Sequence, residues 1–498
     1  MLARKLTSFI GSLAVVCGSL VPSYAQESPP APSAPRSVKI PAVQTAKLPN
    51  GLKIAVVQRR GVPLVAVNLL IDVGAYVEEP DEAGIANMTA SLLTKGTKTR
   101  TATEIAEAIE FLGADLNAGA GWNATNISLN VTSDKLAAAF AIFADVVRSP
   151  KFEQSELDLA RSQALDGLTY NLKQPSFLSN YVATKYAFGE HPAGGTPDTL
   201  AKMTAASVRK FYDESYLPDR STMIFAGDID LVKAKALATR YFSTWKPSAS
   251  KELIQSIITN AAPKSKPAEP KTPAGILVID LPNSGQASVS YTKKMPNGRV
   301  DNAKGKPQAD PGYYQAMVLN SVLGGGYSSR LNAEIRIKRG LSYGAGSGFG
   351  WRYGDSNFTT RAQTKNESAP EVASLVIDEI RKLTASSVDN DELVPRKSVL
   401  TGGFGRSLET INGLASAVSD LYAFGLPASE LNSYIGRVNS VTDAQIRSFA
   451  ADHLLGGSII IVGDYAVFKN DLAARFPGVK IDVIKAADLD LSKDDLRK

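Results

Sequence analysis

The chain has 498 residues, of which 44% are hydrophobic and 21% are charged. This is the composition of a globular protein, and the length exceeds what one ordinary hydrophobic core supports, so at least two domains are expected. The formal net charge of +6 is mild for this length and comes without a basic block interleaved with aromatics, which argues against nucleic acid as a partner.

Residues 1–25 have the organisation of a secretory signal peptide. Arg4 and Lys5 supply the positive start, an apolar stretch follows, and Ser23-Tyr24-Ala25 ends in a small-residue cleavage site. The sequence therefore predicts export, with no transmembrane span after cleavage. A membrane anchor is the alternative, but the stretch is short for a span and runs into the Pro-rich residues 29–32.

Cys17 is the only cysteine, and it lies inside this signal. The mature chain is therefore expected to have no disulfide and no sulfur ligand for a metal. A lipid anchor on Cys17 is disfavoured, because Val15 and Val16 stand where small residues would be expected.

Two breaks in composition divide the rest of the chain. Residues 26–45 are rich in Pro, Ala and Ser and are expected to be a flexible lead-in. The segment Ala261–Ala274, AAPKSKPAEPKTPA, has almost nothing to bury and is predicted to be a linker. The expected parts are an N-terminal domain over residues 46–260, a C-terminal domain over residues 275–485 and a tail over residues 486–498.

Both domains mix strand and helix periodicities. Apolar alternation predicts strands, and apolar residues at helical spacing predict helices. In chain order these are strands over Leu52–Val57 and Leu64–Asp72, helices over Ala102–Leu112 and Leu136–Val147, and buried strands over Met223–Ala226 and Ile459–Val462. The fold class is predicted to be α+β, with a mostly antiparallel sheet in each domain that helices cover on one face.

The two halves also repeat each other in sequence. Several matches share one offset of 236 positions, among them Glu156 with Glu392, Gly167 with Gly403, and Gly227-Asp228 with Gly463-Asp464. The stretch Thr204–Phe211 resembles Thr442–Phe449 at an offset of 238. The chain is therefore predicted to use one fold twice, as two tandem homologous domains.

The segment 84–97, GIANMTASLLTKGT, resembles the zinc-binding helix of the pitrilysin/insulinase-type peptidases, the inverted zincins. In that family a glycine-led apolar start precedes H-x-x-E-H and a Lys-Gly-Thr follows. The two histidines bind zinc and the glutamate is the general base. Here Asn87, Ala90 and Ser91 occupy those positions, and none of them supplies the chemistry.

The remaining metal ligands are missing as well. The family's third ligand, a glutamate on a later helix, aligns with Gly167 when no gap is introduced. The chain has only two histidines, His191 and His453, and they lie in opposite halves, so no two-histidine zinc motif exists. His191 is interpreted as a structural loop residue, and His453 as a helix cap or surface residue. No metal site is expected in this chain.

A second family signature is present in the C-terminal half. The glycines Gly324, Gly325 and Gly326 lead toward a basic segment with Arg336, and Tyr343 follows seven residues later. The resemblance implies that the glycine loop contacts substrate, and that Arg336 and Tyr343 stabilise the oxyanion at the scissile peptide. A guanidinium and a phenol are donors suited to that charge.

Simpler interpretations of these residues stay open. Arg336, Lys338 and Arg339 could only complement a helix C-terminus, and Tyr343 could be an ordinary strand aromatic. Gly340 is expected to end the helix, so that Tyr343 begins a strand. The glycines are not expected to hold phosphate, because no Lys-Ser/Thr follows them.

The segment Leu112–Ala118 resembles the family's edge strand, onto which a substrate peptide adds as a further strand. Asn117 and Ala118 are candidate substrate contacts on this basis. Since this half lacks the metal ligands, a vestige or a partner contact is the alternative.

The resemblance covers nearly the whole mature chain and implies half of a clamshell. In the two-subunit bacterial members and the mitochondrial processing peptidase, one subunit carries H-x-x-E-H and a homologous one does not. By this analogy the chain is the zinc-less subunit, inactive alone, whose homologous partner holds zinc and with which it hydrolyses unfolded peptides in the periplasm. The alternatives are a structural relative within a larger complex and a peptide-binding module without catalysis.

Overall fold

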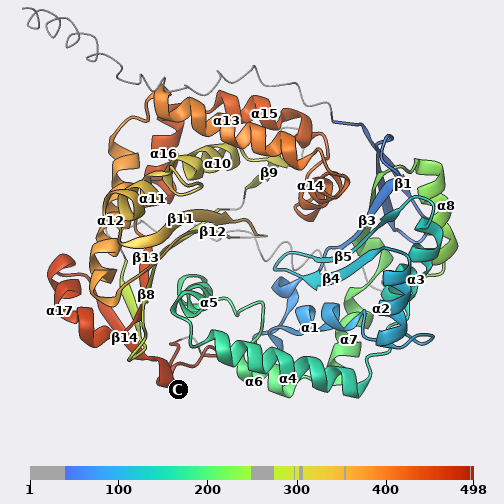
Figure 1. Ribbon diagram of the computed structural model, residues 1–498, viewed down its shortest axis with the longest axis horizontal. Helices are drawn as coiled ribbons and strands as arrows, with labels where there is room; N and C mark the ends of the chain where they lie inside the picture. The colour runs from blue at the N-terminus through green and yellow to red at the C-terminus, as the bar shows by residue number, and fades with distance from the viewer. Residues whose placement is uncertain (1–39, 248–273, 297, 302–306, 353–354, 494) are drawn as a thin grey trace, which may run out of the picture. The chain divides into compact units, whose positions relative to one another are not determined.

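Each half of the chain folds around one six-stranded sheet (Figure 1). The computed structural model describes residues 40–247, 274–296, 298–301, 307–352, 355–493 and 495–498. The predicted signal peptide, the lead-in up to residue 39 and the linker up to residue 273 lie outside the described residues. Strand β1 begins at Val43, inside the expected lead-in, because its backbone pairs with β2.

The N-terminal half alternates strands with groups of helices. Its elements are β1 (Val43–Lys47), β2 (Lys53–Gln58), β3 (Leu64–Ile71), η1 (Ala75–Val77), η2 (Pro80–Glu82), α1 (Ile85–Leu92), α2 (Ala102–Phe111), β4 (Asp115–Ala120), β5 (Thr125–Thr132), α3 (Leu136–Arg148), α4 (Gln154–Asn171), α5 (Pro175–Phe188), α6 (Pro197–Lys202), α7 (Ala205–Ser215), η3 (Pro218–Arg220), β6 (Ser221–Gly227) and α8 (Leu231–Phe242).

The C-terminal half follows the same plan. Its elements are β7 (Ile276–Asp280), β8 (Ala287–Met295), β9 (Arg299–Asp301), β10 (Pro307–Ala309), α10 (Pro311–Leu323), α11 (Arg330–Asn332), the π-helix η4 (Ala333–Lys338), β11 (Ser342–Gly350), β12 (Ser356–Thr364), η5 (Asn366–Ser368), α12 (Ala369–Ala385), α13 (Asn390–Ser407), α14 (Ile411–Ala423), α15 (Glu430–Ser440), α16 (Asp443–His453), β13 (Ser458–Gly463), α17 (Tyr465–Arg475), β14 (Ile481–Lys485) and η6 (Ala486–Asp488).

The two sheets confirm the predicted α+β class. The strand order is β1-β2-β6-β3-β5-β4 in the N-terminal half and β11-β12-β8-β13-β7-β14 in the C-terminal half. Most neighbours are antiparallel, and the pairs β2–β6, β13–β7 and β14–β7 are parallel. Strands β4 and β11 occupy equivalent edges of the two sheets.

The internal repeat is a repeat of secondary structure. Helices α4 and α13 begin and end 236 positions apart, at the offset seen in the sequence. Helices α7 and α16 begin and end 238 positions apart, and both start with a threonine N-cap in a capping box. The Thr204 hydroxyl accepts from the Ser207 backbone N–H, and the Thr442 hydroxyl accepts from that of Gln445.

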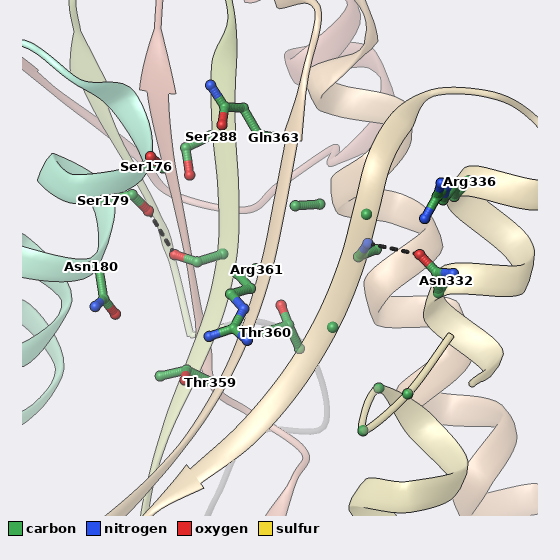
Figure 2. A pocket seen from close by; sticks show the side chains of 18 of the residues that line it. Ser176, Ser179, Asn180, Ser288, Asn332, Arg336, Thr359, Thr360, Arg361 and Gln363 are labelled. Carbon is green, nitrogen blue, oxygen red and sulfur yellow. Dashed lines mark hydrogen bonds between the residues drawn. The ribbon is translucent and has the colours of Figure 1, made fainter. Parts of the chain in front are cut away.

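Two equivalent helices are exchanged between the halves. Helix α5 packs on β8 and β13 of the C-terminal sheet, and α14, which starts 236 positions after it, packs on β3 and β6 of the N-terminal sheet. On α5, the Ser179 hydroxyl shares a hydrogen bond of 2.9 Å with that of Ser290 on β8 (Figure 2). Leu178 and Val182 pack there against buried residues of β7, β13 and β14.

The exchange corrects the expectation that helices cover one face of each sheet. Along β13, Ile459 and Ile461 join the core under α10, α12 and α16, whereas Ile460 and Val462 join the cluster around α5. Both faces of β13 are therefore buried, which suits its continuous apolar sequence. Leu491 and Leu496, in the expected C-terminal tail, are buried in the cluster around α5 as well.

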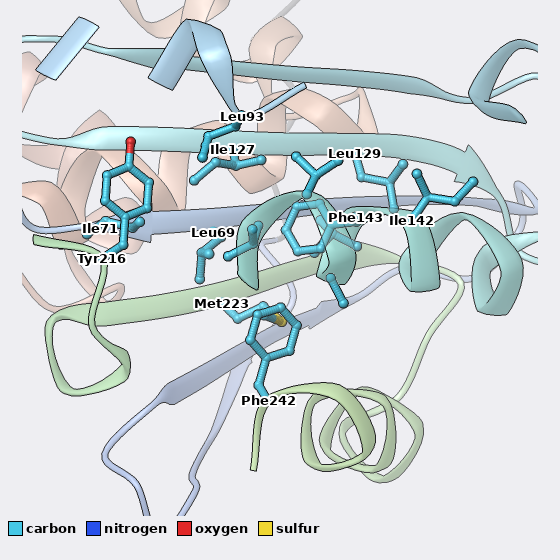
Figure 3. Packing of buried hydrophobic residues seen from close by; sticks show 14 of the residues in the cluster. Leu69, Ile71, Leu93, Ile127, Leu129, Ile142, Phe143, Tyr216, Met223 and Phe242 are labelled. Carbon is cyan, nitrogen blue, oxygen red and sulfur yellow. The ribbon is translucent and has the colours of Figure 1, made fainter. Parts of the chain in front are cut away.

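The core of the N-terminal half lies on the other face of its sheet, under α3 and α8 (Figure 3). Phe143 and Phe242 from the helices pack there with Met223 of β6 and Leu129 of β5. The Phe140 ring lies 5.4 Å from that of Phe143. The predicted helix over residues 136–147 thus supplies the aromatic layer of the core. None of the helices within the described residues is both long and apolar enough to cross a membrane.

Candidate functional site

The positions of the degenerate zinc motif share one region of the N-terminal half. Asn87 and Ser91, one turn apart on α1, are both exposed, whereas Ala90 is fully buried. Gly167 lies on α4, which packs on α1, and it is exposed with nothing near the position of a Cβ atom. The two helices that carry these positions are therefore in contact, but their side chains provide no set of zinc ligands. Among the described residues, no cluster of His, Cys, Asp and Glu could hold a metal ion.

His191 belongs to the support of α1. Its Nε2 lies 3.0 Å from Glu78 Oε2 and 3.1 Å from the Ala75 carbonyl oxygen. The buried Glu78 carboxylate accepts hydrogen bonds from the backbone N–H groups of Gly84 and Ala86, at 2.9 and 2.8 Å. A carboxylate at a helix N-terminus satisfies donors that have no partner within the helix. His191 thus has the structural role expected for it, in the loop between α5 and α6.

His453 ends α16, as the sequence predicted. Its ring lies 4.7 Å from that of Phe449, one turn earlier on the same helix. Neither histidine contacts the positions of the degenerate motif through the hydrogen bonds described for it.

A cavity of about 660 Å³ lies on the C-terminal sheet (Figure 2). Its walls come from α5, β8, the loop after α10, η4, β11 and β12. The lining is small and polar, with Ser176, Ser179, Asn180, Ser288, Ser290, Asn332, Thr359, Thr360 and Gln363 beside glycines. We call it the arginine cavity, because its charged lining residues, among those described, are Arg336 and Arg361.

Arg336 reaches this cavity from a π-helical turn. Its guanidinium carbon lies 5.0 Å from the centre of the Tyr327 ring. Lys338 and Arg339, by contrast, form ion pairs with Glu334, which together lower the pKa of that carboxyl. Within the basic segment, Lys338 and Arg339 are therefore paired with an acid at the helix end, whereas Arg336 lines the cavity. A π-helical turn often occurs at functional sites.

Tyr343 lies outside the arginine cavity. Gly340 has a φ of +64° and ends the helix as predicted, and β11 begins at Ser342. The pairing of β11 with β12 shifts register between Ser342 and Ala345, so Tyr343 sits in a bulge of this edge strand. Its side chain is 89% exposed. The structure thus brings Arg336 to the glycine loop but leaves Tyr343 pointing outward, and the predicted role of both residues stays a prediction.

The glycine loop is positioned by close backbone contact with β11. The Ser347 N–H donates to the Gly324 carbonyl at 3.1 Å, and a Cβ on Gly324 would lie 2.2 Å from the Ser347 nitrogen. A Cβ on Gly325 would lie 2.9 Å from the Asn320 carbonyl oxygen. Gly326 has open space around it. Two of the three glycines are therefore required for packing, whatever they bind.

We expect Gly324→Ala to lower the free energy of unfolding by about 1–3 kcal/mol, because the added methyl group forces the loop away from β11. Gly326→Ala is the matched control and should stay within about 0.5 kcal/mol of the parent. Urea denaturation followed by circular dichroism checks both. Equal stability of the two variants would contradict the packing role of Gly324.

Three lining residues, Ser176, Ser179 and Asn180, come from the exchanged helix α5. No pattern in the sequence predicts that this helix packs on the sheet of the other half. Arg361 was missed for another reason. Thr359, Arg361 and Gln363 follow one another at every second position of β12. This period-two pattern of polar residues marks one face of a strand. That alternation is the signal that could have found it.

The predicted edge strand is confirmed, with changed bounds. Strand β4 runs over Asp115–Ala120 and is the last strand of its sheet, whereas residues 112–114 form the turn after α2. Asn117 is exposed, and its Nδ2 donates to Asp115 Oδ1 at 3.0 Å. Asn117 and Ala118 do not line the arginine cavity.

Known sequence families match both halves of the chain. The family described as "Insulinase (Peptidase family M16)" matches residues 53–189, and "Peptidase M16 inactive domain" matches residues 202–399. An uncharacterized zinc protease of Streptomyces coelicolor is 25% identical over 420 residues, which cover 83% of this chain and 88% of that protein. One of Rickettsia felis is 26% identical over 404 residues, covering 79% and 92%.

Solved structures share the fold. The crystal structure of a peptidase M16 inactive domain from Pseudomonas fluorescens is 26% identical, with a TM-score of 0.73, and covers 84% of this chain and 98% of its own. A protease from Helicobacter pylori is 20% identical, with a TM-score of 0.76 over 85% and 100% of the two chains. The likeness in fold therefore spans both halves.

Proposed function

Because the chain belongs to peptidase family M16 but has Asn87, Ala90 and Ser91 in its zinc motif, we propose that it is the zinc-less subunit of a two-subunit exported metallopeptidase. The signal peptide predicted over residues 1–25 supports export to the periplasm. The partner is a homologous chain with an intact H-x-x-E-H, and the substrates are unfolded peptides.

The observation that carries this proposal is the arginine cavity. Arg336 and Arg361 face a polar space of about 660 Å³, and among the described lining residues no carboxylate neutralises them. A guanidinium stays protonated at any physiological pH and offers several fixed N–H donors. Such a cavity suits carbonyl oxygens and carboxylates of a peptide, whose backbone the Ser, Thr and Asn side chains can also bind.

In the assembled enzyme, the partner's zinc would polarise the scissile carbonyl and activate water. This chain would add donors aimed at the charge that develops on that carbonyl oxygen. Arg336, which pairs with no acid among the described residues, is free to do so without breaking an ion pair. Tyr343, exposed at the start of β11, would reach the peptide only in the presence of a partner.

Co-purification with metal analysis tests the proposal. The chain should be expressed alone and together with an exported homologue that carries H-x-x-E-H. We expect less than stoichiometric zinc and no hydrolysis of an unfolded fluorescent peptide from the chain alone, and one zinc and measurable hydrolysis per heterodimer. One tight zinc in the isolated chain would contradict the proposal, and a stable heterodimer without hydrolysis would favour the structural alternative.

A further inference from the structure

A second cavity, of about 830 Å³, shares no lining residue with the arginine cavity among the described residues. Its walls come from α10, α13, α14 and α15 and from the turn between β4 and β5. The lining is mostly apolar and includes the aromatic residues Trp122, Tyr313, Tyr314, Trp351, Phe404, Phe424 and Tyr434. This volume lies within the range of cavities that enclose a small organic ligand. We call it the aromatic cavity.

Five rings of this cavity form one connected series, in which the Tyr314 ring lies 5.2 Å from that of Tyr313 and 6.0 Å from that of Tyr434. The Tyr313 and Trp351 rings lie 4.9 Å apart, and the Phe404 and Tyr434 rings are stacked at 4.2 Å. Burial raises the pKa of both Tyr313 and Tyr434, so their phenols stay neutral at physiological pH. Neutral aromatic faces carry negative potential and attract cations.

The wall of the cavity already contains a compensated carboxylate. Glu430 is buried and lies 3.5 Å from Arg437, and it accepts hydrogen bonds of 3.2 Å from the hydroxyls of Tyr314 and Ser433. The Arg437 guanidinium in turn lies 5.3 Å from the centre of the Tyr314 ring. The Arg437 guanidinium is therefore a cation of the protein itself that lies over the Tyr314 ring and pairs with Glu430.

Asp420 is the carboxylate without such compensation. It projects from α14, lines the cavity and is exposed toward it, and no Lys or Arg lines the cavity among the described residues. The protein that surrounds it on its other sides raises its pKa by desolvation. Asp420 and Tyr313 line the same cavity, and the charge of Asp420 contributes to raising the pKa of Tyr313, after the larger effects of burial, Tyr434 and Tyr314.

We propose that the aromatic cavity binds an organic cation, a quaternary ammonium or guanidinium group with an apolar body, with the cation between the ring faces and Asp420. The rings supply cation–π attraction and apolar contact, and the Asp420 carboxylate supplies a negative charge that no Lys or Arg of the described lining neutralises. The cation can come from a free small molecule or from an arginine side chain of a peptide. Both sources have the same recognition chemistry.

The position of the cavity in the repeat fits a binding role. Gly403 lines it, and Gly403 matches Gly167, the empty third-ligand position, at the offset of 236. Helix α10 packs on α13 as α1 packs on α4. In the second copy of the fold, the position that corresponds to Gly167 therefore lines a cavity with aromatic walls.

Tryptophan fluorescence of the full chain tests this inference. Two of the three tryptophans, Trp122 and Trp351, line the cavity, whereas Trp245 is buried in the N-terminal core. The probes are benzyltrimethylammonium, N-acetylarginine amide and the neutral benzyl alcohol. We expect saturable fluorescence changes with at least one cation, and weaker binding of benzyl alcohol.

Asp420→Asn should weaken cation binding by about tenfold or more, because it removes the facing charge, and should leave benzyl alcohol binding unchanged. Asp420→Glu should retain cation binding, and Asp378→Asn, on an exposed face of α12, is the matched control that should behave as the parent. Thermal unfolding by circular dichroism confirms that each variant folds.

The two cation probes distinguish the sources of the ligand. Preference for benzyltrimethylammonium indicates a free organic cation, and preference for N-acetylarginine amide indicates a peptide side chain. Absence of saturable binding by both cations overturns the inference, as does equal binding of cations and benzyl alcohol that Asp420→Asn leaves unchanged. The result does not depend on the proposed peptidase function, because every measurement uses the isolated chain.

Discussion

Replacing Arg336 with alanine should lower the turnover of the assembled peptidase by about a hundredfold or more, while the heterodimer still forms. Removal of a donor that acts on the developing oxyanion has effects of this size. The side chain leaves the arginine cavity without disturbing an ion pair, so the fold should stay intact. Steady-state hydrolysis of an unfolded fluorescent peptide gives kcat and KM, and size-exclusion chromatography reports the heterodimer.

The fall should be in kcat, with KM changed less, because the contact strengthens in the transition state. Arg339→Ala is the matched control: it removes an exposed guanidinium three residues away that pairs with Glu334. Tyr343→Phe should also reduce kcat yet keep stability within about 0.5 kcal/mol, because the side chain is 89% exposed. Unchanged turnover in both Arg336→Ala and Tyr343→Phe would contradict a catalytic role for these two residues.

Restoring zinc binding in the N-terminal half should require new ligands on both α1 and α4. We expect Asn87→His with Ser91→His to bind zinc weakly, because two imidazoles leave the tetrahedral set half filled. Adding Gly167→Glu should raise the zinc affinity by at least about tenfold, since loss of even an outer-shell partner costs that much. The exposed position of Gly167 on α4 and the space around it make room for the carboxylate. Competition with a chromogenic chelator measures the affinity.

Zinc binding in these variants should not bring hydrolysis. Ala90, at the position of the general base, is fully buried, so Ala90→Glu would place a carboxylate in the core at a cost of several kcal/mol. A control pair, Ser162→His with Asp166→His, puts two exposed histidines one turn apart on α4 and should bind zinc as weakly as the pair on α1. Equal affinity with and without Gly167→Glu would mean that Gly167 is not the third-ligand position.

Residue identity and local spacing predicted much of the fold. The helix expected over residues 136–147 is α3, and the strand expected over residues 64–72 is β3, within one residue at each end. The offset of 236 between sequence matches is the offset between α4 and α13. Gly340 ends its helix because a left-handed conformation suits glycine. Each of these features depends on neighbours in the chain.

Contacts between distant segments could not be predicted in the same way. The hydrogen bond between Ser179 and Ser290 joins residues 111 positions apart, and it exists because α5 crosses to the other half. Nothing in the helical spacing of α5 says which sheet its apolar face covers. The same holds for the aromatic cavity, which is lined by residues of both halves, among them Trp122 and Tyr434.

What the sequence alone determined about this protein is the absence of H-x-x-E-H: Asn87, Ala90 and Ser91 stand at its three positions, and the chain's two histidines lie in opposite halves. The place of Gly167 at the third-ligand position stays a prediction. Only the tertiary structure decided which residues share a cavity. It placed Arg336 with Arg361 and with α5, and left Tyr343 exposed in a bulge. The reason is physical: ligand chemistry is a property of single side chains at fixed spacing, whereas a cavity is formed by the packing of elements that the chain sequence keeps far apart.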